Sequence, residues 1–229
     1  MRVKFVVSLL VSFILSGAFA QGKYDKIDKI ARAKIPSKYT YSPKGIANYL
    51  VQFAKTEEEK ARILFVYTTA VIEYDLKRSG TQVTPFWTIN NGVGVCQHYA
   101  ELYTALCGHV GLKCAYVTGY ARNDRGYRPF QRAKGKPHAW NVVRINGKWY
   151  IVDATWADGG NSVIRLSKDI RRKQMHFDET YWMADPEEMI LTHWPRNARW
   201  QLLDGVVKLR QFKRNNYAIK NVKKRVSPY

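Results

Sequence analysis

The stretch from Asn91 to Val117 constrains the fold of this chain most, because it predicts a tight turn, a helix and a strand in direct succession. Gly92 and Gly94 allow the backbone to bend sharply just before Cys96. Apolar side chains then recur at helical spacing, at Tyr99, Leu102, Tyr103, Leu106 and Val110. Gly111 fits a left-handed helix cap, and the residues that follow it indicate a strand. The stretch therefore predicts a helix that begins at a cysteine.

A thiol in the first turn of a helix meets unpaired backbone N–H groups and the positive end of the helix dipole. Both favour the thiolate, which is the nucleophilic form of cysteine. Cys96 is therefore a candidate nucleophile. The alternative is a buried structural cysteine, since cysteine is among the most buried residue types. The partners that the fold brings to the thiol decide between the two.

The N-terminus has the pattern of a secretory signal peptide, which we place at residues 1–20. Arg2 and Lys4 precede an apolar run that ends in small residues at Ala18 and Ala20. The run is too short and wrongly flanked for a stable membrane span, and no later stretch is apolar enough. We therefore expect an exported protein, periplasmic or secreted, without a transmembrane segment.

The 229 residues carry a formal net charge of +20, which predicts attraction to polyanions. Nucleic acid, anionic lipid and acidic cell-wall or glycan polymers all qualify, and charge alone does not choose among them. No motif of a known nucleic-acid-binding module accompanies the charge, and export argues against such a partner. We therefore expect no nucleic-acid partner.

Three cysteines, Cys96, Cys107 and Cys114, make an odd number, so in an oxidising compartment at least one should be free or pair between chains. Cys107 is predicted to lie in the core, and a Cys107–Cys114 disulfide is left open. There is no C-x-x-C motif, and the five histidines lie apart along the sequence, at His98, His109, His138, His176 and His193. We therefore expect neither a metal site nor a cofactor.

Amphipathic stretches predict three helices ahead of the cysteine, at residues 23–34, 43–54 and 57–76. The third is the clearest, because Thr56 fits an N-cap and three glutamates follow it where they suit the helix dipole. Residues 77–93 are predicted to be a loop that leads to Cys96. Residues 122–136 are predicted to be a basic loop, and the chain beyond residue 158 to be irregular and aromatic.

Asn146-Gly147 is the strongest short hairpin signal in the chain, and it predicts paired strands at residues 138–145 and 148–155. A two-residue turn fixes the register, so His138 and Asp153 become diagonal neighbours on one face, about 7–8 Å apart. An imidazole and a carboxylate can span that separation with a hydrogen bond, which is how an acid orients a general base. The alternative is that Asp153 caps the following turn and His138 is a satisfied histidine at a strand edge.

Three motifs now resemble a known family. GVCQHYA at residues 94–100, HAWN at 138–141 and DATW at 153–156 are similar to the signature blocks of the transglutaminase-like superfamily. The helix at 57–75 and the segment at 181–203 also resemble its bacterial, kyphoscoliosis-peptidase-like branch. The resemblance implies an α+β fold with a papain-like transglutaminase core, in which N-terminal helices and the nucleophile helix pack on an antiparallel β-sheet.

With this resemblance we divide the chain into four parts. These are a signal peptide at 1–20, an N-terminal helical extension at 21–55, a transglutaminase-like domain at 56–203 and a basic C-terminal tail at 204–229, which is either packed over the surface or partly disordered.

The resemblance implies that Cys96 is the nucleophile, His138 the base and then the acid, and Asp153 the orienting carboxylate. The implied reaction is attack on a peptide or carboxamide carbonyl, followed by transfer of the thioester to water or an amine. The backbone N–H of Cys96 is the first candidate oxyanion donor. The second donor is left open, with three candidates in Trp87, Asn90 and Gln97.

Departures from the family pattern limit what is carried over. No acidic calcium-binding cluster is recognisable, so calcium dependence is not expected. Gln97 and His98 stand where relatives often have an acid and a glycine, so His98 either lines the cleft or lies on the helix surface. The family also includes inactive members.

From the three motifs we predict a cysteine hydrolase or acyltransferase with a protein or peptide substrate, acidic or cell-wall associated. The alternative is an inactive module that binds an anionic polymer or a protein partner.

Overall fold

The computed structural model describes residues 22–40, 42–82, 84–122, 136–158 and 177–214. The predictions for the signal peptide, for residues 123–135 of the basic loop and for residues 215–229 of the tail lie outside the described residues.

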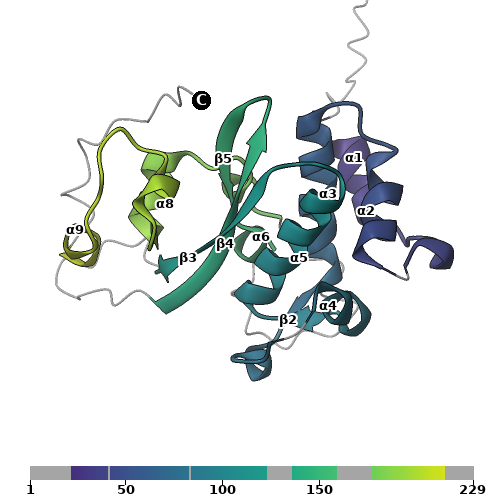
Figure 1. The fold of residues 1–229 in the computed structure, drawn as a ribbon, viewed down its shortest axis with the longest axis horizontal. Coiled ribbons are helices and arrows are strands. Elements are labelled where there is room, and N and C mark those ends of the chain that lie inside the picture. Colours follow the sequence, from purple (N-terminus) through teal and green to yellow (C-terminus); the bar gives the residue numbers. More distant parts are fainter. Residues whose placement is uncertain (1–21, 41, 83, 123–135, 159–176, 215–229) are drawn as a thin grey trace, which may run out of the picture.

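A four-stranded antiparallel sheet, in the order β5-β4-β3-β6, forms the middle of the molecule. Its strands are β3 (Cys114–Ala121), β4 (Lys136–Ile145), β5 (Lys148–Val152) and β6 (His193–Pro195). In Figure 1 the N-terminal helices lie on one side of the sheet and α8 and α9 on the other. The α+β fold with the nucleophile helix packed on an antiparallel sheet is therefore confirmed.

Three helices precede the cysteine, as predicted: α1 (Asp25–Ala31), α2 (Pro43–Val51) and α3 (Glu57–Val71). A capping box starts α3, because the Thr56 hydroxyl accepts from Glu59 N–H at 3.1 Å and the Glu59 carboxylate accepts from Thr56 N–H at 3.3 Å. The helix ends five residues earlier than predicted. Ile72 is extended there, and β1 (Glu73–Tyr74) pairs in parallel with β2 (Val93–Gly94).

The predicted loop at 77–93 is wrong in part. It contains the last residues of a short 3₁₀ helix, η2 (Leu76–Arg78), and then α4 (Pro85–Asn91). Thr84 caps α4 by accepting from Trp87 N–H at 3.2 Å, Pro85 occupies the first position, and Gly92 ends the helix at φ 63°. The Thr-Pro pair is a start signal, but seven residues are too few to show a helical period.

The helix predicted to begin at Cys96 is confirmed as α5 (Cys96–His109), with Gly111 in the left-handed region at φ 78° just beyond it. Its inner face packs into the main core together with side chains of α1, α2 and α3. Fully buried members of this core include Ile46, Leu50, Ile63, Leu64, Phe65, Leu102, Tyr103 and Leu106. The helices assigned to an N-terminal extension thus share one apolar core with α5.

The hairpin register is confirmed, since Ile145 pairs with Lys148 and Asn141 with Val152. Asn146 and Gly147 both have positive φ, at 49° and 83°, as a two-residue turn requires. The second strand, however, ends at Val152 rather than at residue 155. The chain turns there into a short helix, α6 (Ala154–Ala157), for which Asp153 is the N-cap.

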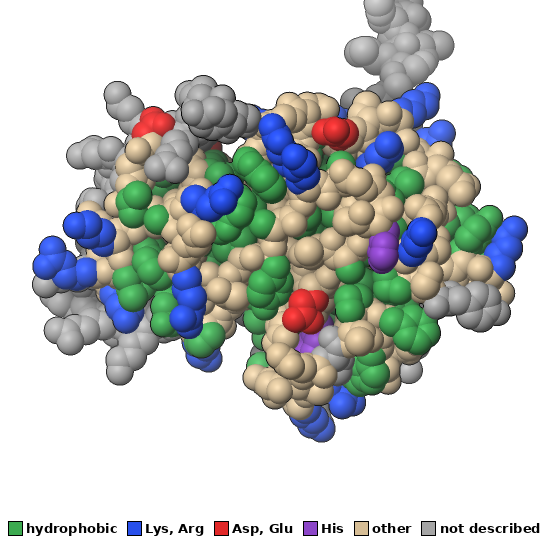
Figure 2. Space-filling model, in the orientation of Figure 1, with side chains coloured by type: hydrophobic (Ala, Val, Ile, Leu, Met, Phe, Trp, Pro, Cys, Tyr) green, Lys and Arg blue, Asp and Glu red, His purple; other side chains and the backbone are tan. Residues whose placement is uncertain are grey.

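The segment after residue 177 crosses to the other face of the sheet. It contains η3 (Glu179–Tyr181), α8 (Pro186–Thr192), η4 (Ala198–Gln201) and α9 (Leu209–Arg214). A second small core of Ile190, Leu203, Val207 and Phe212 shows that the predicted tail is packed against the molecule at Val207 and Phe212. Lys and Arg side chains are spread over the face shown in Figure 2, among few Asp and Glu. Within the described ranges, no helix combines the length and hydropathy that crossing a bilayer requires.

Candidate active site

Cys96 is the first residue of α5, and a buried histidine holds that end of the helix. The Val95 N–H donates to His98 Nδ1 at 2.9 Å, and His98 Nε2 donates to the Thr81 carbonyl at 3.0 Å. Gly94 makes room for this ring, because a Cβ there would lie 2.7 Å from the His98 Cβ. The prediction that His98 lies on the helix surface is therefore wrong, because the residue is buried, while cleft lining stays a prediction. Its side chain satisfies a backbone donor at the helix start, as a capping residue does.

His138 and Asp153 form a short hydrogen bond, with His138 Nε2 2.6 Å from Asp153 Oδ2. The other carboxylate oxygen, Oδ1, accepts from the Trp156 N–H at 3.0 Å and so caps α6. The structure thus shows both hydrogen bonds that the sequence left as alternatives for Asp153, one for each oxygen. The carboxylate is fully buried, so a charge on it depends on these donors.

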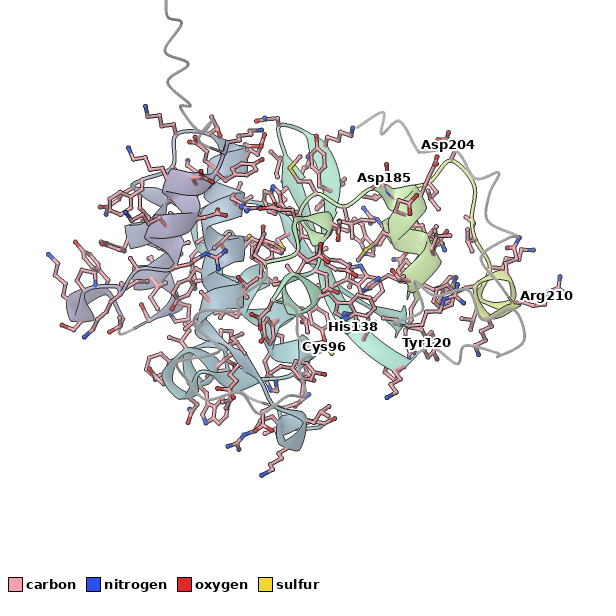
Figure 3. All side chains as sticks on the ribbon, turned by 180° about the vertical axis from the view of Figure 1, so that it is seen from behind. Cys96, Tyr120, His138, Asp185, Asp204 and Arg210 are labelled. Carbon is pink, nitrogen blue, oxygen red and sulfur yellow. The ribbon has the colours of Figure 1, made fainter. Side chains whose placement is uncertain are left out.

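The thiol of Cys96 meets the His138 side chain and the backbone N–H of Ala139, and Cys96 and His138 lie next to each other in Figure 3. Because His138 Nε2 is engaged by Asp153, Nδ1 is left for the sulfur. Burial raises the pKa of the Cys96 thiol, but the hydrogen bond and positive charge of His138, helped by Ala139 N–H, outweigh it and lower the pKa below its usual value.

The His138 imidazole is the partner of the Cys96 thiol, and its pKa is shifted in the opposite direction. Burial lowers the pKa of His138, but the charge and hydrogen bond of Asp153 more than compensate and raise it to about 10. Burial likewise raises the pKa of Asp153, and the two histidines that contact it bring the pKa well below its usual value. The lowered pKa of the Cys96 thiol and the raised pKa of the His138 imidazole both shift the pair toward a thiolate beside an imidazolium, with a buried carboxylate behind.

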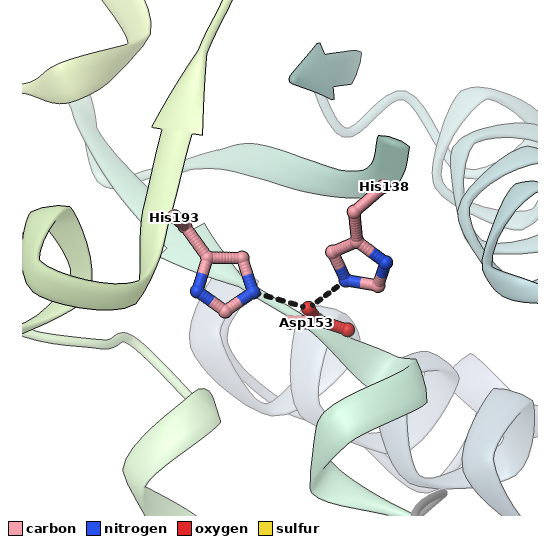
Figure 4. Close-up of side chains that lie close together, drawn as sticks. All are labelled: His138, Asp153 and His193. Carbon is pink, nitrogen blue, oxygen red and sulfur yellow. Dashed lines mark hydrogen bonds and ion pairs between the residues drawn. The ribbon is translucent and has the colours of Figure 1, made fainter. Parts of the chain in front are cut away.

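A second histidine, which the sequence analysis did not assign to the site, contacts the same carboxylate. His193 Nε2 lies 3.1 Å from Asp153 Oδ2, and Figure 4 shows His138 and His193 on either side of Asp153. His138 and His193 lie far apart along the sequence, and the fold brings both to one carboxylate oxygen. Within the sequence, the signal was weak: His193 belongs to the segment at 181–203 that resembled the family, but no spacing connects it to the three motifs.

His138, Asp153 and His193 each offer one donor atom, and these atoms lie within 4.8 Å of one another. The trio could thus approach one metal ion together. In the structure, both rings contact the same carboxylate oxygen at hydrogen-bond distance, so the trio is accounted for as a hydrogen-bond network and we assign no metal to it.

The structure does not distinguish among the three candidates for a second oxyanion donor. The Gln97 side-chain amide donates to Glu101 Oε1 at 2.8 Å, and the Trp87 ring lies under the Arg78 guanidinium at 5.4 Å. Asn90 is exposed. The choice among the three stays a prediction.

All three cysteines are free thiols in the structure, so the Cys107–Cys114 disulfide is not formed there. Cys107 is fully buried, and burial raises the pKa of its thiol well above the usual value. Cys114 is half-buried and lies 3.9 Å from the Thr104 hydroxyl. Cys107 is therefore a core residue, as predicted.

Several known proteins are similar to this chain. The family model of the transglutaminase-like superfamily matches residues 44–154. Kyphoscoliosis peptidase of Homo sapiens is 33% identical over 174 residues, which are 73% of this chain and 25% of that protein. Hillarin of Drosophila melanogaster is 27% identical over 204 residues, which are 83% of this chain and 24% of that protein. The chain thus spans about a quarter of the length of these relatives. The resemblance seen in the three motifs is confirmed, and this chain belongs to the transglutaminase-like superfamily.

Proposed function

We propose that this protein is an exported cysteine hydrolase or acyltransferase that acts on a peptide or carboxamide bond, with Cys96, His138 and Asp153 as its triad. The observation that carries the proposal is a half-buried thiol at a helix start, set against an imidazole that a buried carboxylate holds at 2.6 Å. A relative that carries the name peptidase is in keeping with this chemistry.

The reaction follows from the protonation state. The Cys96 thiolate attacks the carbonyl carbon, and the negative charge moves to the carbonyl oxygen, where the Cys96 backbone N–H stabilises it. His138 donates its proton to the departing nitrogen as the C–N bond breaks, which leaves a thioester on Cys96. His138 then takes a proton from water as that water attacks the thioester, and the acid is released. Hydrolysis is preferred to transfer because water reaches a half-exposed thiol readily.

The pH range of the proposed activity follows from the two partners. The lower limit is set by the Cys96 thiol, whose pKa lies below its usual value, because protonation below that pKa removes the nucleophile. The upper limit is set by His138, whose pKa is about 10, because deprotonation above it removes the acid. We therefore expect activity to level off between these two pKa values and to fall as pH rises through about 10.

Alkylation by iodoacetamide tests the proposal without a known substrate. We expect Cys96 to react about 10- to 100-fold faster than Cys114 at neutral pH, because the thiolate is the reactive form. Mass spectrometry of tryptic peptides separates the two thiols, so Cys114 is an internal reference. His138→Ala should bring Cys96 to the rate of Cys114. Equal rates in the unmodified chain would contradict the proposal and favour the inactive binding module.

The substrate class and location belong to the same proposal. The net charge of +20 supports a preference for acidic or cell-wall-associated substrates, and the pattern at residues 1–20 supports export. Export predicts a mature N-terminus near Gln21, which N-terminal sequencing of the protein made in a secreting host would detect. A mature protein that retains residues 1–20 would contradict export.

A further inference from the structure

The geometry points to His193 as a positioning residue for the proposed triad. It donates a hydrogen bond to Asp153 that keeps the carboxylate charged and in place, so that His138 stays protonated beside the Cys96 thiolate. This inference rests on the proposed function. It assigns His193 no contact with substrate.

The hydrogen bonds of the ring define its role. His193 Nε2 lies 3.1 Å from Asp153 Oδ2, and its Nδ1 lies 2.8 Å from the Thr192 hydroxyl oxygen. A neutral imidazole has one donor and one acceptor nitrogen. With Nε2–H donated to the carboxylate, Nδ1 is an acceptor that faces the Thr192 hydroxyl, whose one proton the Met189 carbonyl at 3.3 Å can also accept. Thr192 thus supports the tautomer in which His193 offers Asp153 a donor.

The surroundings of His193 favour the neutral ring. The side chain is fully buried, and ring centroids of Trp156 and Trp140 lie 4.3 and 5.2 Å away. Among the described residues, the titratable groups that face it are Asp153, His138 and Tyr181, the last at 6.2 Å between ring centroids. Burial is the main reason that the pKa of His193 falls to about 4. The charge on His138 lowers it further, and Asp153 opposes both. The two histidines on one carboxylate thus differ in charge.

The sheet brings the three groups together. His193 pairs with Ala121 across β6 and β3, while Asp153 follows β5 at the opposite edge of the sheet. A side chain at position 119, between them, would obstruct this face, because a Cβ there would lie 2.5 Å from the Trp140 ring. Glycine at this position allows Trp140 to lie over β3 and to meet His193 with its edge.

Loss of the hydrogen bond from His193 should raise the pKa of the Asp153 carboxyl group. A buried carboxylate with fewer donors becomes more basic, so the shared proton moves from His138 toward Asp153. The Cys96 thiolate then loses its positive partner, and its protonation extends to higher pH. A residue that only fills space in the core would leave this titration unchanged.

The test is the pH dependence of Cys96 alkylation in His193→Phe and His193→Gln. Phenylalanine fills the space and has no donor. We expect it to move the acid limb of the profile upward by about one pH unit, which makes labelling on that limb about tenfold slower. Glutamine retains an N–H donor, and we expect it to label within about threefold of the unmodified chain. Thr192→Val has nearly the same shape but lacks the hydroxyl that supports this tautomer, and we expect a smaller shift in the same direction.

Circular dichroism and thermal unfolding verify that the variants are folded. If His193→Phe does not fold, Thr192→Val takes its place as the deciding variant. An unshifted profile in the deciding variant overturns the inference. The two proposals fail differently. If Cys96 of the unmodified chain reacts no faster than Cys114, the proposed function fails, whereas fast labelling in the unmodified chain with an unshifted variant removes only the role of His193.

Discussion

At the scale of single residues, Asp153 shows how one side chain serves structure and chemistry at once. Its Oδ1 accepts from the Trp156 N–H and starts α6, while its Oδ2 accepts from His138 at 2.6 Å and from His193 at 3.1 Å. Its own backbone N–H donates to the Tyr181 carbonyl at 3.0 Å. The carboxylate therefore cannot rotate without breaking the helix cap, and the orientation of the imidazole follows from the cap.

Asparagine at this position separates the two tasks. Asp153→Asn should retain the cap, because asparagine and aspartate are comparable N-caps, but it removes the negative charge. Without that charge, burial lowers the pKa of His138, so the imidazolium is lost near neutral pH. We expect Cys96 alkylation at neutral pH to slow by about 10²-fold, at little change in helix content. Site-resolved alkylation and circular dichroism measure the two effects.

Asp153→Asn should also change how the stability of the fold depends on pH. The raised pKa of His138 stabilises the fold fully below the unfolded value near 6.5, and this contribution is lost as pH rises through about 10. The lowered pKa of Asp153 stabilises the fold above its unfolded value and is lost as pH falls below it. Asp75→Asn is the control, because Asp75 caps η2 through Lys77 N–H at 3.0 Å. Unchanged alkylation in Asp153→Asn would contradict the assigned role.

At the scale of elements, the approach of β6 to β3 depends on one glycine. A Cβ at Gly119 would lie 2.1 Å from the Trp194 carbonyl oxygen, in the neighbouring strand, as well as close to the Trp140 ring. A backbone oxygen of a paired strand cannot move away without lengthening the hydrogen bonds of the pair. The short strand β6, which carries His193, is therefore held in place by the absence of a side chain.

Gly119→Ala should consequently force β6 away from β3. We expect it to reduce the free energy of unfolding by about 3 kcal/mol or more, as overpacking against backbone does, and to slow Cys96 alkylation. Urea denaturation measures the first effect. Gly108→Ala is the matched control, because a Cβ there meets nothing within 4 Å and Gly108 lies within α5. It should raise stability by about 0.5–1 kcal/mol. Equal stability of both variants would show that the contact at Gly119 is relieved at no cost.

At the scale of the whole molecule, a buried arginine joins segments that lie far apart in the sequence. Arg62 of α3 is fully buried, and its Nε donates to Asp28 of α1 at 2.9 Å. Its Nη1 donates to Glu179 of η3 at 2.7 Å, and its guanidinium lies 4.5 Å from the Tyr24 ring. The N-terminal helices and the segment that leads to β6 are thus attached to the same side chain. The candidate site depends on both.

The net charge is a property of the whole molecule that could select the substrate. If the positive charge selects the substrate, acidic peptides should react about tenfold faster than neutral peptides of the same length at low ionic strength. This advantage should decline as salt is added, because the Debye length shortens to about 8 Å at physiological ionic strength. Competition between the two peptides for Cys96, measured as protection from alkylation, gives the ratio. A ratio that does not change with salt would contradict selection by charge.

Much of the site could be predicted because its signals are local. The start of α5 at Cys96 follows from two glycines and a helical period, and the register between β4 and β5 follows from Asn146-Gly147. These signals extend over a few residues, so a sequence carries them completely. They were enough to propose Cys96, His138 and Asp153 and to indicate the family. The missed helix α4 is a local error, caused by a pattern too short to show a period.

The tertiary structure alone decided the rest. His193 is 40 residues from Asp153, and the two meet only because β6 pairs with β3 in a sheet whose other edge ends at Asp153. His98 was predicted to line the cleft or to lie on the helix surface, whereas the structure buries it against the loop that carries Thr81. Periodicity and turn chemistry act between neighbours in the chain, whereas these contacts arise when distant segments close over one core. The sequence by itself therefore determined which residues form the proposed triad, and only the tertiary structure decided which side chains support it.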